Sequence, residues 1–277
     1  MAAAELPSFD LVVATVDRAD QLGRLFASLD GQTHQRFRVL LVDQNEDDRL
    51  DDVIRSYGAL PIERLRTPRG LSRARNAALA HLEAELVAFP DDDCVYAADL
   101  LERVSRRFAA EPALDGLTGR AIDHLGRSSP SWAAEPARLT RDNLWNRAIS
   151  FAIFLRTAVV RKVGEFDEQL GLGSGTPWSS GEETEYLVRA VANGARIEYD
   201  PALTVTHDEK AVTDSLGARE GASMGYILRK HEYPKRTVTR MLIRPAGGVI
   251  VALAQRDTER ARFQLDTLRG RLRGYRS

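Results

Sequence analysis

The sequence predicts an α/β protein with a mostly parallel central sheet, flanked by helices and followed by a helical C-terminal extension. Two observations support this prediction. Short runs of apolar, often β-branched residues alternate with helical patterns over the first ~110 residues, and such alternation is typical of parallel strands joined by right-handed crossovers. The 277 residues, 43% of them hydrophobic and 29% charged, are enough to enclose a large core.

The first half of the chain provides four strand–helix pairs. Each apolar run predicts a buried strand, and the first helical pattern places its four apolar residues on one face. Ser72 is a candidate N-cap of the third helix. The predicted strands are Phe9–Val16, Phe37–Asp43, Ile62–Leu65 and Glu85–Pro90, and the predicted helices are Gln21–Leu29, Arg49–Tyr57, Leu71–Leu82 and Leu100–Phe108.

The second half is less regular. Residues 123–146 predict an excursion over the sheet, Ser150–Leu155 a return to it, and Gly171–Glu183 a loop that leads into a helix over Glu182–Ala192. Two short strands over 195–207 end at His207, and the chain is predicted helical from about Met224. We therefore expect one domain over 1–223, with halves 1–122 and 123–223, and a basic amphipathic helical extension over 224–277.

Composition limits where the protein acts. A single cysteine, Cys94, excludes an intrachain disulfide framework and favours a reducing compartment. The start lacks the pattern of a secretory signal, and the apolar run Ala246–Ala254 is shorter than the ~20 residues of a spanning helix. These features predict a cytoplasmic protein, either soluble or peripheral on the inner face of the cell membrane.

Charge is distributed unevenly along the chain. Residues 235–277 contain 11 Lys and Arg against 3 Asp and Glu, a net charge of +8, and the rest of the chain carries −9. A nucleic-acid-binding domain would present a basic surface throughout, so nucleic acid is not an expected partner. The basic C-terminal segment instead predicts contact with an anionic surface such as a membrane.

Polar side chains follow three of the predicted strands. Thr15 and Arg18 follow the first strand, Asp43 ends the second, and Asp91–Asp93 follow the fourth. Ligands of open parallel sheets bind beyond the carboxyl ends of the strands, so these groups are expected to share one crevice. No glycine-rich phosphate loop is present, and a bound nucleotide would need another way to neutralise its phosphates.

Three successive aspartates suit a divalent cation. Like charges resist ionising together unless a cation or strong donors lie among them. In an extended segment alternate side chains share one side, so Asp91 and Asp93 are predicted to point into the crevice and bind Mg²⁺. The alternative is a solvated acidic turn, and Cys94 beside it is predicted to be a small buried residue.

Five motifs in order resemble family 2 glycosyltransferases, the inverting GT-A class. They are VVATVDR, LLVDQNEDD, GLSRARNAAL, FPDDDC and WSSGEETEYLVR, and the resemblance covers Phe9–His207. It implies a GT-A fold with a Rossmann-like sheet, a nucleotide-sugar donor, a metal-binding DxD motif with Mg²⁺ or Mn²⁺, and a carboxylate base on a helix.

The resemblance also implies roles for single residues. Asp43 is similar to the aspartate that recognises the base, although ATVDR departs from the commoner Pro-Thr-Tyr-Asn-Arg pattern. The remaining roles are nucleotide contacts for Thr15, Arg18 and Asp92, a diphosphate contact for Arg75, a ribose or metal contact for Asp91, and metal ligation for Asp93 and His207. For Arg75 the alternative is an ordinary exposed helix arginine, and for His207 a strand-end histidine with no such role.

The helix that begins near Glu182 contains several acids. By resemblance Glu183 is the catalytic base and Glu182 is its competitor. A structural interpretation is also open, because Ser180 and Glu183 fit a capping box and Glu185 and Arg189 fit an exposed i,i+4 pair. Trp178 is predicted either to contact a sugar or acceptor or to pack within its loop.

We therefore expect an inverting, metal-dependent glycosyltransferase of polysaccharide or cell-envelope biosynthesis. The donor would be a UDP-, GDP- or dTDP-sugar and the acceptor a glycan or lipid-linked glycan. The basic extension would dock on an anionic leaflet or pack on the catalytic domain. Two alternatives stay open: a non-catalytic sugar-nucleotide-binding or scaffold protein, and a sugar nucleotidyltransferase, whose glycine-rich signature is not found here.

Overall fold

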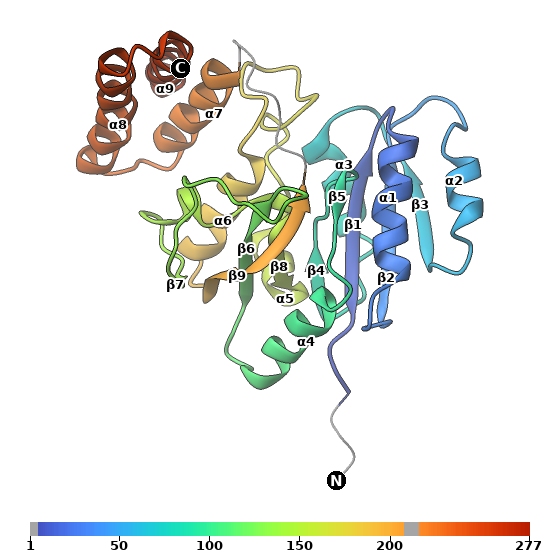
Figure 1. The fold of residues 1–277 in the computed structure, drawn as a ribbon. Helices are drawn as coiled ribbons and strands as arrows, with labels where there is room; N and C mark the ends of the chain where they lie inside the picture. Colours follow the sequence, from blue (N-terminus) through green and yellow to red (C-terminus); the bar gives the residue numbers. More distant parts are fainter. Residues whose placement is uncertain (1–4, 208–215) are drawn as a thin grey trace. The chain divides into compact units, whose positions relative to one another are not determined.

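A computed structural model describes residues 5–207 and 216–277. Its described residues form two compact units (Figure 1). The first comprises 5–69, 73–166 and 186–207, and the second 70–72, 167–185 and 216–277. The predicted division at residues 223 and 224 stays a prediction.

The first unit contains the sheet. Its described strands follow the order β3-β2-β1-β4-β8-β6-β9-β5, with β7 paired to β9. The pairs β3–β2, β2–β1 and β1–β4 are parallel, as predicted, whereas β8 is antiparallel to both β4 and β6. The strands are β1 (Phe9–Thr15), β2 (Phe37–Asp43), β3 (Ile62–Arg66), β4 (Leu86–Ala88), β5 (Cys94–Val95), β6 (Gly116–Ile122), β7 (Ala137–Arg138), β8 (Ile153–Arg156) and β9 (Ile197–His207).

Helices flank this sheet, so the predicted fold class is confirmed. The helices over the first 200 residues are α1 (Ala19–Asp30), α2 (Asp51–Ser56), α3 (Leu71–Leu79), α4 (Leu100–Ala110), α5 (Thr157–Val163) and α6 (Glu182–Ala192), with two 3₁₀ turns at Leu144–Asn146 and Ser150–Ala152. All four apolar residues predicted on one face of α1 are buried. Ser72 lies inside α3 rather than before it, and its hydroxyl donates to the carbonyl of Leu170.

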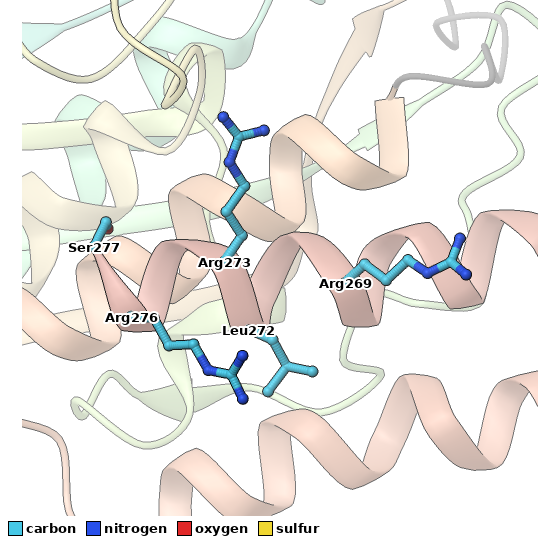
Figure 2. Close-up of a pocket in the computed structure, with 5 residues that line it drawn as sticks. All are labelled: Arg269, Leu272, Arg273, Arg276 and Ser277. Carbon is cyan, nitrogen blue, oxygen red and sulfur yellow. The ribbon is translucent and has the colours of Figure 1, made fainter.

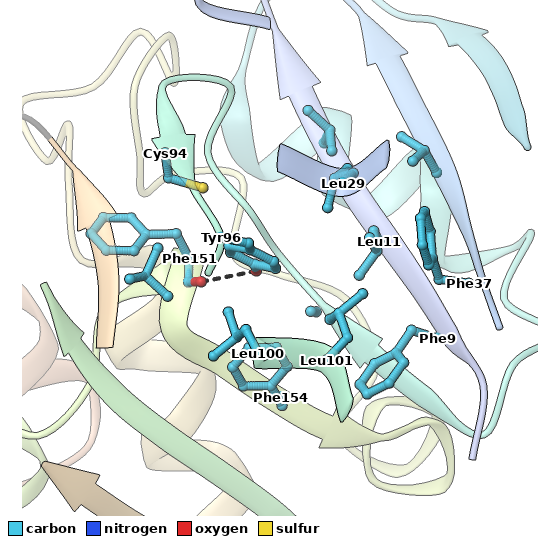
Figure 3. Packing of buried hydrophobic residues seen from close by; sticks show 14 of the residues in the cluster. Phe9, Leu11, Leu29, Phe37, Cys94, Tyr96, Leu100, Leu101, Phe151 and Phe154 are labelled. Carbon is cyan, nitrogen blue, oxygen red and sulfur yellow. Dashed lines mark hydrogen bonds between the residues drawn. The ribbon is translucent and has the colours of Figure 1, made fainter. Parts of the chain in front are cut away.

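The core of the sheet unit lies between β1 and the α1 and α4 helices (Figure 3). Aromatic rings fill much of it, with Phe9 and Phe154 packed edge to face at 6.4 Å. The buried hydroxyl of Tyr96 donates to the carbonyl of Phe151 at 3.0 Å, so this core contains a satisfied polar group. Cys94 is fully buried here, as predicted.

Two differences from the predicted elements concern strands β6 and β9. The two short strands expected over 195–207 are one strand, β9, which bulges at Asp200–Leu203 where its register against β6 shifts. Strand β6 was not predicted, because two glycines interrupt its apolar pattern. At Gly119 a Cβ would lie 2.1 Å from the Leu203 carbonyl oxygen, so the bulge requires glycine there.

The second unit is mainly helical. Its long helices are α7 (Leu216–Lys230), α8 (Lys235–Ala254) and α9 (Thr258–Arg276), so the helical C-terminal region begins earlier than Met224. Helices α7 and α9 approach closely through glycines: a Cβ at Gly225 would lie 2.2 Å from the carbonyl oxygen of Arg271. Among the described residues one helix, α8, is long and apolar enough to cross a membrane by length and composition, although its apolar run was expected to be too short.

Candidate active site

The carboxyl ends of β1, β2 and β4 bring the predicted site residues of the sheet unit together. Thr15 and Asp43 are register partners at the ends of β1 and β2. Beyond β4 the chain turns through Asp91–Asp93 into β5, whose Cys94 pairs with His207 at the end of β9. This antiparallel pairing places the aspartate loop beside the histidine.

Asp91, Asp93 and His207 form a cluster whose ligand atoms lie within 4.8 Å of one another. Nε2 of His207 lies 3.0 Å from Oδ1 of Asp93, and its ring stacks on Phe151 at 4.6 Å with an interplanar angle of 5°. Stacking fixes the plane of the imidazole, so Nε2 points at the carboxylates. Two carboxylates and one imidazole are a donor set that holds divalent cations.

Asp92 points away from this cluster. Its carboxylate is buried, accepts from the Thr15 hydroxyl at 2.7 Å and lies 3.1 Å from Nη1 of Arg18. Burial raises the pKa of Asp92 to about 6, against the hydrogen bond from Thr15. The expected extended segment is instead a turn, closed by the Cys94 N–H and the Asp91 carbonyl at 3.2 Å. Asp91 and Asp93 nevertheless lie in one cluster, and the middle aspartate bonds to Thr15.

Asp93 has the opposite electrostatic environment. Burial alone would raise the pKa of its carboxyl, but the hydrogen bond with His207 and the charges of His207 and Arg18 lower it to about 2. Arg18 donates to both Asp92 and Asp93 through Nη1. The three aspartates thus occupy adjacent positions because donors and cations lie among them.

Arg75 is a buried residue of the site. Its side chain is 2% exposed, its guanidinium carbon lies 5.8 Å and 5.5 Å from the ring centroids of Phe89 and Phe166, and Nη2 lies 3.4 Å from Oδ1 of Asp91. The alternative of an ordinary exposed helix arginine is therefore wrong. Ser150, which the sequence did not indicate, donates to the same Asp91 oxygen at 3.2 Å.

Asp43 is buried with both oxygens engaged. Oδ1 accepts from the backbone and side-chain amides of Asn45 at 2.9 and 2.7 Å, and Oδ2 accepts from Nε and Nη2 of Arg64 at 3.0 and 2.6 Å. These four bonds fill the acceptor capacity of a carboxylate. Recognition of a base by Asp43 stays a prediction, and it requires one of these donors to give way.

In the second unit, the two competing glutamates have different surroundings. The Glu182 side chain is buried, and its Oε2 lies 3.1 Å from where a Cβ of Gly171 would stand, next to the Ser72 hydroxyl. Glu183 is only partly buried. Helix α6 begins at Glu182, after Gly181 with its φ of 80°, and the Ser180 hydroxyl donates to that of Ser223 at 3.0 Å.

Trp178 packs within the same unit. Its ring stacks on Tyr226 with centroids 4.1 Å apart and an interplanar angle of 19°. One face of the indole is therefore covered by protein. A contact of the other face with a sugar or acceptor stays a prediction.

The prediction that Glu185 and Arg189 form an exposed pair is wrong. Glu185 is fully buried and contacts Lys230 and His231, whereas Arg189 donates to the carbonyls of Val163 and Glu165. The i,i+4 spacing indicates that two residues share a helix face, but it does not indicate whether another element covers that face.

Comparison with known proteins identifies the class. The family described as glycosyl transferase family 2 matches residues 10–164, which is more than half of the chain. The protein therefore belongs to glycosyl transferase family 2.

Its curated relatives are glycosyltransferases. The chain is 26% identical over 258 residues to the pre-mycofactocin glycosyltransferase of Mycobacterium tuberculosis, which covers 87% of this chain and 51% of that protein. It is 25% identical over 171 residues to an uncharacterized glycosyltransferase of Nostoc sp., which covers 57% of this chain and 53% of that protein. The chain thus spans about half the length of the curated relatives it matches.

Solved structures share the fold. A mannosyltransferase from Pyrobaculum calidifontis, solved in complex with GDP-Man and Mn²⁺, superposes with a TM-score of 0.68 at 13% identity, over 98% of this chain and 88% of that chain. TarS of S. aureus, residues 1–349, superposes with a TM-score of 0.63 at 18% identity, over 95% of this chain and 91% of that chain. These likenesses establish the GT-A fold.

Proposed function

We propose that this protein transfers a sugar from a nucleotide-sugar donor to a hydroxyl acceptor, with inversion at the anomeric carbon and with a divalent cation. The observation that carries the proposal is the cluster of Asp91, Asp93 and His207 at the carboxyl edge of the sheet. Family membership and structural neighbours solved with GDP-Man or with a UDP-sugar support it.

The residues present fit a divalent cation. Asp93 offers an ionised carboxylate because its pKa is about 2, and Asp91 and His207 supply oxygen and nitrogen ligands within 4.8 Å. Mg²⁺ and Mn²⁺ both accept such ligands together with phosphate oxygens. When bound, the ion would neutralise charge that develops on the departing nucleoside diphosphate.

The protein's own residues would perform the remaining steps. Glu183 accepts the proton of the acceptor hydroxyl as that oxygen attacks the anomeric carbon, and the bond from this carbon to the diphosphate oxygen breaks on the opposite face. Glu183 is favoured over Glu182, because the Glu182 side chain is buried against Gly171. Arg75 supports the diphosphate and holds Asp91 in place.

The nucleotide class can be measured directly. Calorimetric titration of UDP, GDP and dTDP, each with and without Mn²⁺, should find one nucleotide whose binding depends on the metal. Asp93→Ala should abolish that binding, whereas Asp99→Ala, a change at an exposed aspartate that pairs with Arg103, should leave it intact. If no nucleotide binds to the wild type, the proposed function is wrong.

The second unit presents a surface suited to an anionic membrane. Four of the six large exposed hydrophobic residues of the described chain lie on α8: Ile243, Ile250, Val251 and Leu253. The same helix contains four Lys and Arg and no acid, all four cations within its first half. An exposed apolar face with adjacent cations is the composition of an interfacial helix.

Helix α9 adds cations nearby in the same unit. Arg269, Arg273 and Arg276 line a hollow of about 570 Å³ together with Leu272 and Ser277 (Figure 2). Arg269 also lies 3.6 Å from Asp266, which is not among the residues that line the hollow. Lipid phosphates are the anions that such a surface would meet.

Vesicle sedimentation tests the membrane contact. The wild type should sediment with vesicles of anionic lipid and not with neutral ones, and Ile250→Glu should reduce sedimentation. Leu125→Glu, at an exposed leucine of the other unit, is the matched control. Equal sedimentation of wild type and Ile250→Glu would exclude α8 as the docking element.

A further inference from the structure

Arg120 is a partly buried cation of the sheet unit. It lies on β6, opposite Thr204 of β9, and its Nε is inaccessible to solvent and makes no hydrogen bond. Within 5–207 and 216–277 no hydrogen bond or ion pair of its guanidinium is found. An unpaired cation in such a place costs free energy, because its hydration is not replaced by protein acceptors.

Arg147 lies beside the same strand. Its carbonyl accepts from the hydroxyl of Thr118 at 2.6 Å, and Thr118 precedes Arg120 by two residues on β6. Nη1 of Arg147 donates to the Asn143 carbonyl and the Asn146 side chain, but its Nε is buried without a hydrogen bond.

The positive charges of both guanidinium groups affect the phenol of Tyr199. This buried residue is the register partner of Thr118 between β9 and β6. Burial raises the pKa of the Tyr199 phenol, and the positive charges of Arg120 and Arg147 oppose that rise. Asp200 also acts on this phenol, but its carboxylate accepts from the backbone of Ala202 at 2.8 Å. Two cations therefore lie near the Tyr199 phenol, and the side chain of Asp200 is engaged in its own turn.

We propose that Arg120 and Arg147 bind an oxyanion, a phosphate or a carboxylate, that belongs to the acceptor. Guanidinium groups bind such oxyanions through paired, charge-assisted hydrogen bonds, and the buried Nε atoms are donors of the kind that this geometry uses. The acceptor would then be an acidic glycan or a phosphate-linked one rather than a neutral sugar.

The chain path connects this pair to the candidate active site. Arg147 precedes Ser150 by three residues, and Ser150 donates to Asp91. Three residues span at most about 11 Å, so the backbone at Arg147 lies within that distance of Ser150. The donor's diphosphate already has Arg75 and the Asp91 cluster, which leaves the second cation pair for the other substrate. The assignment to an acceptor rests on the proposed function.

Calorimetric titration with inorganic phosphate, and separately with acetate, tests the pair in metal-free buffer. The wild type should bind one of them, and Arg120→Gln should weaken that binding by about tenfold or more. Tighter binding of phosphate indicates a phosphate-bearing acceptor, and tighter binding of acetate a carboxylate-bearing one. Arg138→Gln, at an exposed arginine of β7, is the matched control and should bind like the wild type.

Unfolding in urea separates a binding role from a structural one. Because Arg120 has no hydrogen-bond or ion-pair partner to lose among residues 5–207 and 216–277, Arg120→Gln should unfold at the same urea concentration as the wild type or at a higher one. The proposal is overturned if the wild type binds neither ion, or if Arg120→Gln binds as tightly as the wild type. If the nucleotide titration fails while phosphate binding still depends on Arg120, the proposed function falls and the oxyanion site stands without its acceptor role.

Discussion

The Nζ atom of Lys230 in α7 lies 2.8 Å from Oε1 of Glu185 in α6, and Nε2 of His231 lies 3.0 Å from the same oxygen. Glu185 is fully buried, so protein groups such as these two must replace water around its carboxylate. We expect Lys230→Met to lower the free energy of unfolding by up to about 3 kcal/mol, because a buried charge would lose its lysine partner. Urea unfolding at neutral pH measures the difference.

A second variant identifies the cause of that loss. Adding Glu185→Gln to Lys230→Met removes the buried charge and should restore part of the stability. Lys162→Met is the control, because Lys162 donates to the Asn193 carbonyl at an exposed site and should cost less than about 0.5 kcal/mol. Equal losses at Lys162 and Lys230 would contradict the role of the buried pair.

The contact between α7 and α9 depends on glycine. A Cβ at Gly274 would lie 1.9 Å from the carbonyl oxygen of Ala222, so Gly274→Ala must push the helices apart, at a cost of about 1–3 kcal/mol or more. In α8, a Cβ at Gly247 meets nothing within 4 Å, and Gly247→Ala should stabilise the protein by about 0.5–1 kcal/mol. The melting temperatures of the two variants should shift in opposite directions relative to the wild type. Shifts in the same direction would contradict the close packing of α7 and α9.

The fold could be predicted where local patterns decide it. The strand Phe37–Asp43 and the helix Glu182–Ala192 agree with their predicted bounds, because an apolar run and a helical period are visible without tertiary information. Strand β6 was missed because its glycines serve close approaches to other strands: Gly119 faces Leu203 in the bulge of β9, and Gly116 faces Leu155 and Ile197. Antiparallel pairing of β8 likewise depends on long-range topology.

The candidate site shows the same limit. Alternation in an extended segment predicted that Asp91 and Asp93 share one side. The structure does bring them together with His207, but through a turn closed by the Cys94 N–H and the Asp91 carbonyl. Ser150 gave no signal, because its contact with Asp91 arises where the chain returns to the sheet. Burial of Glu185 could not be predicted either, since the groups that contact it, Lys230 at the end of α7 and His231 directly after it, follow about 45 residues later.

Protonation of His34, a residue away from the candidate site, should make the free energy of unfolding depend on pH. Burial lowers its pKa below the ordinary 6.5, although the Pro7 carbonyl, 2.9 Å from Nε2, opposes this. As pH falls below 6.5 the unfolded chain binds the proton first, so the free energy of unfolding decreases toward the lower folded pKa. His34→Gln should remove this part of the slope in urea unfolding between pH 7 and pH 5, and an unchanged slope would contradict it.

Loss of His207 should weaken metal binding. His207→Ala removes one of three clustered ligands, and we expect the dissociation constant for Mn²⁺ to rise by at least about tenfold. A titration in which electron paramagnetic resonance detects the free Mn²⁺ measures this constant. His81→Ala is the control, because His81 pairs with Glu63 at an exposed site. Equal affinity of the wild type and His207→Ala would remove the histidine from the ligand set.

The two glutamates at the start of α6 should respond differently to the same chemical change. Glu183→Gln removes the proposed base, so turnover should fall by ~10²–10⁴-fold while metal-dependent binding of the nucleoside diphosphate persists. Glu182→Gln changes a buried side chain next to Gly171 and Ser72, and should cost about 1–3 kcal/mol of unfolding free energy with turnover nearly unchanged. Steady-state turnover and urea unfolding of both variants separate these outcomes. The reverse result, with turnover lost only in Glu182→Gln, would transfer the role of base to Glu182.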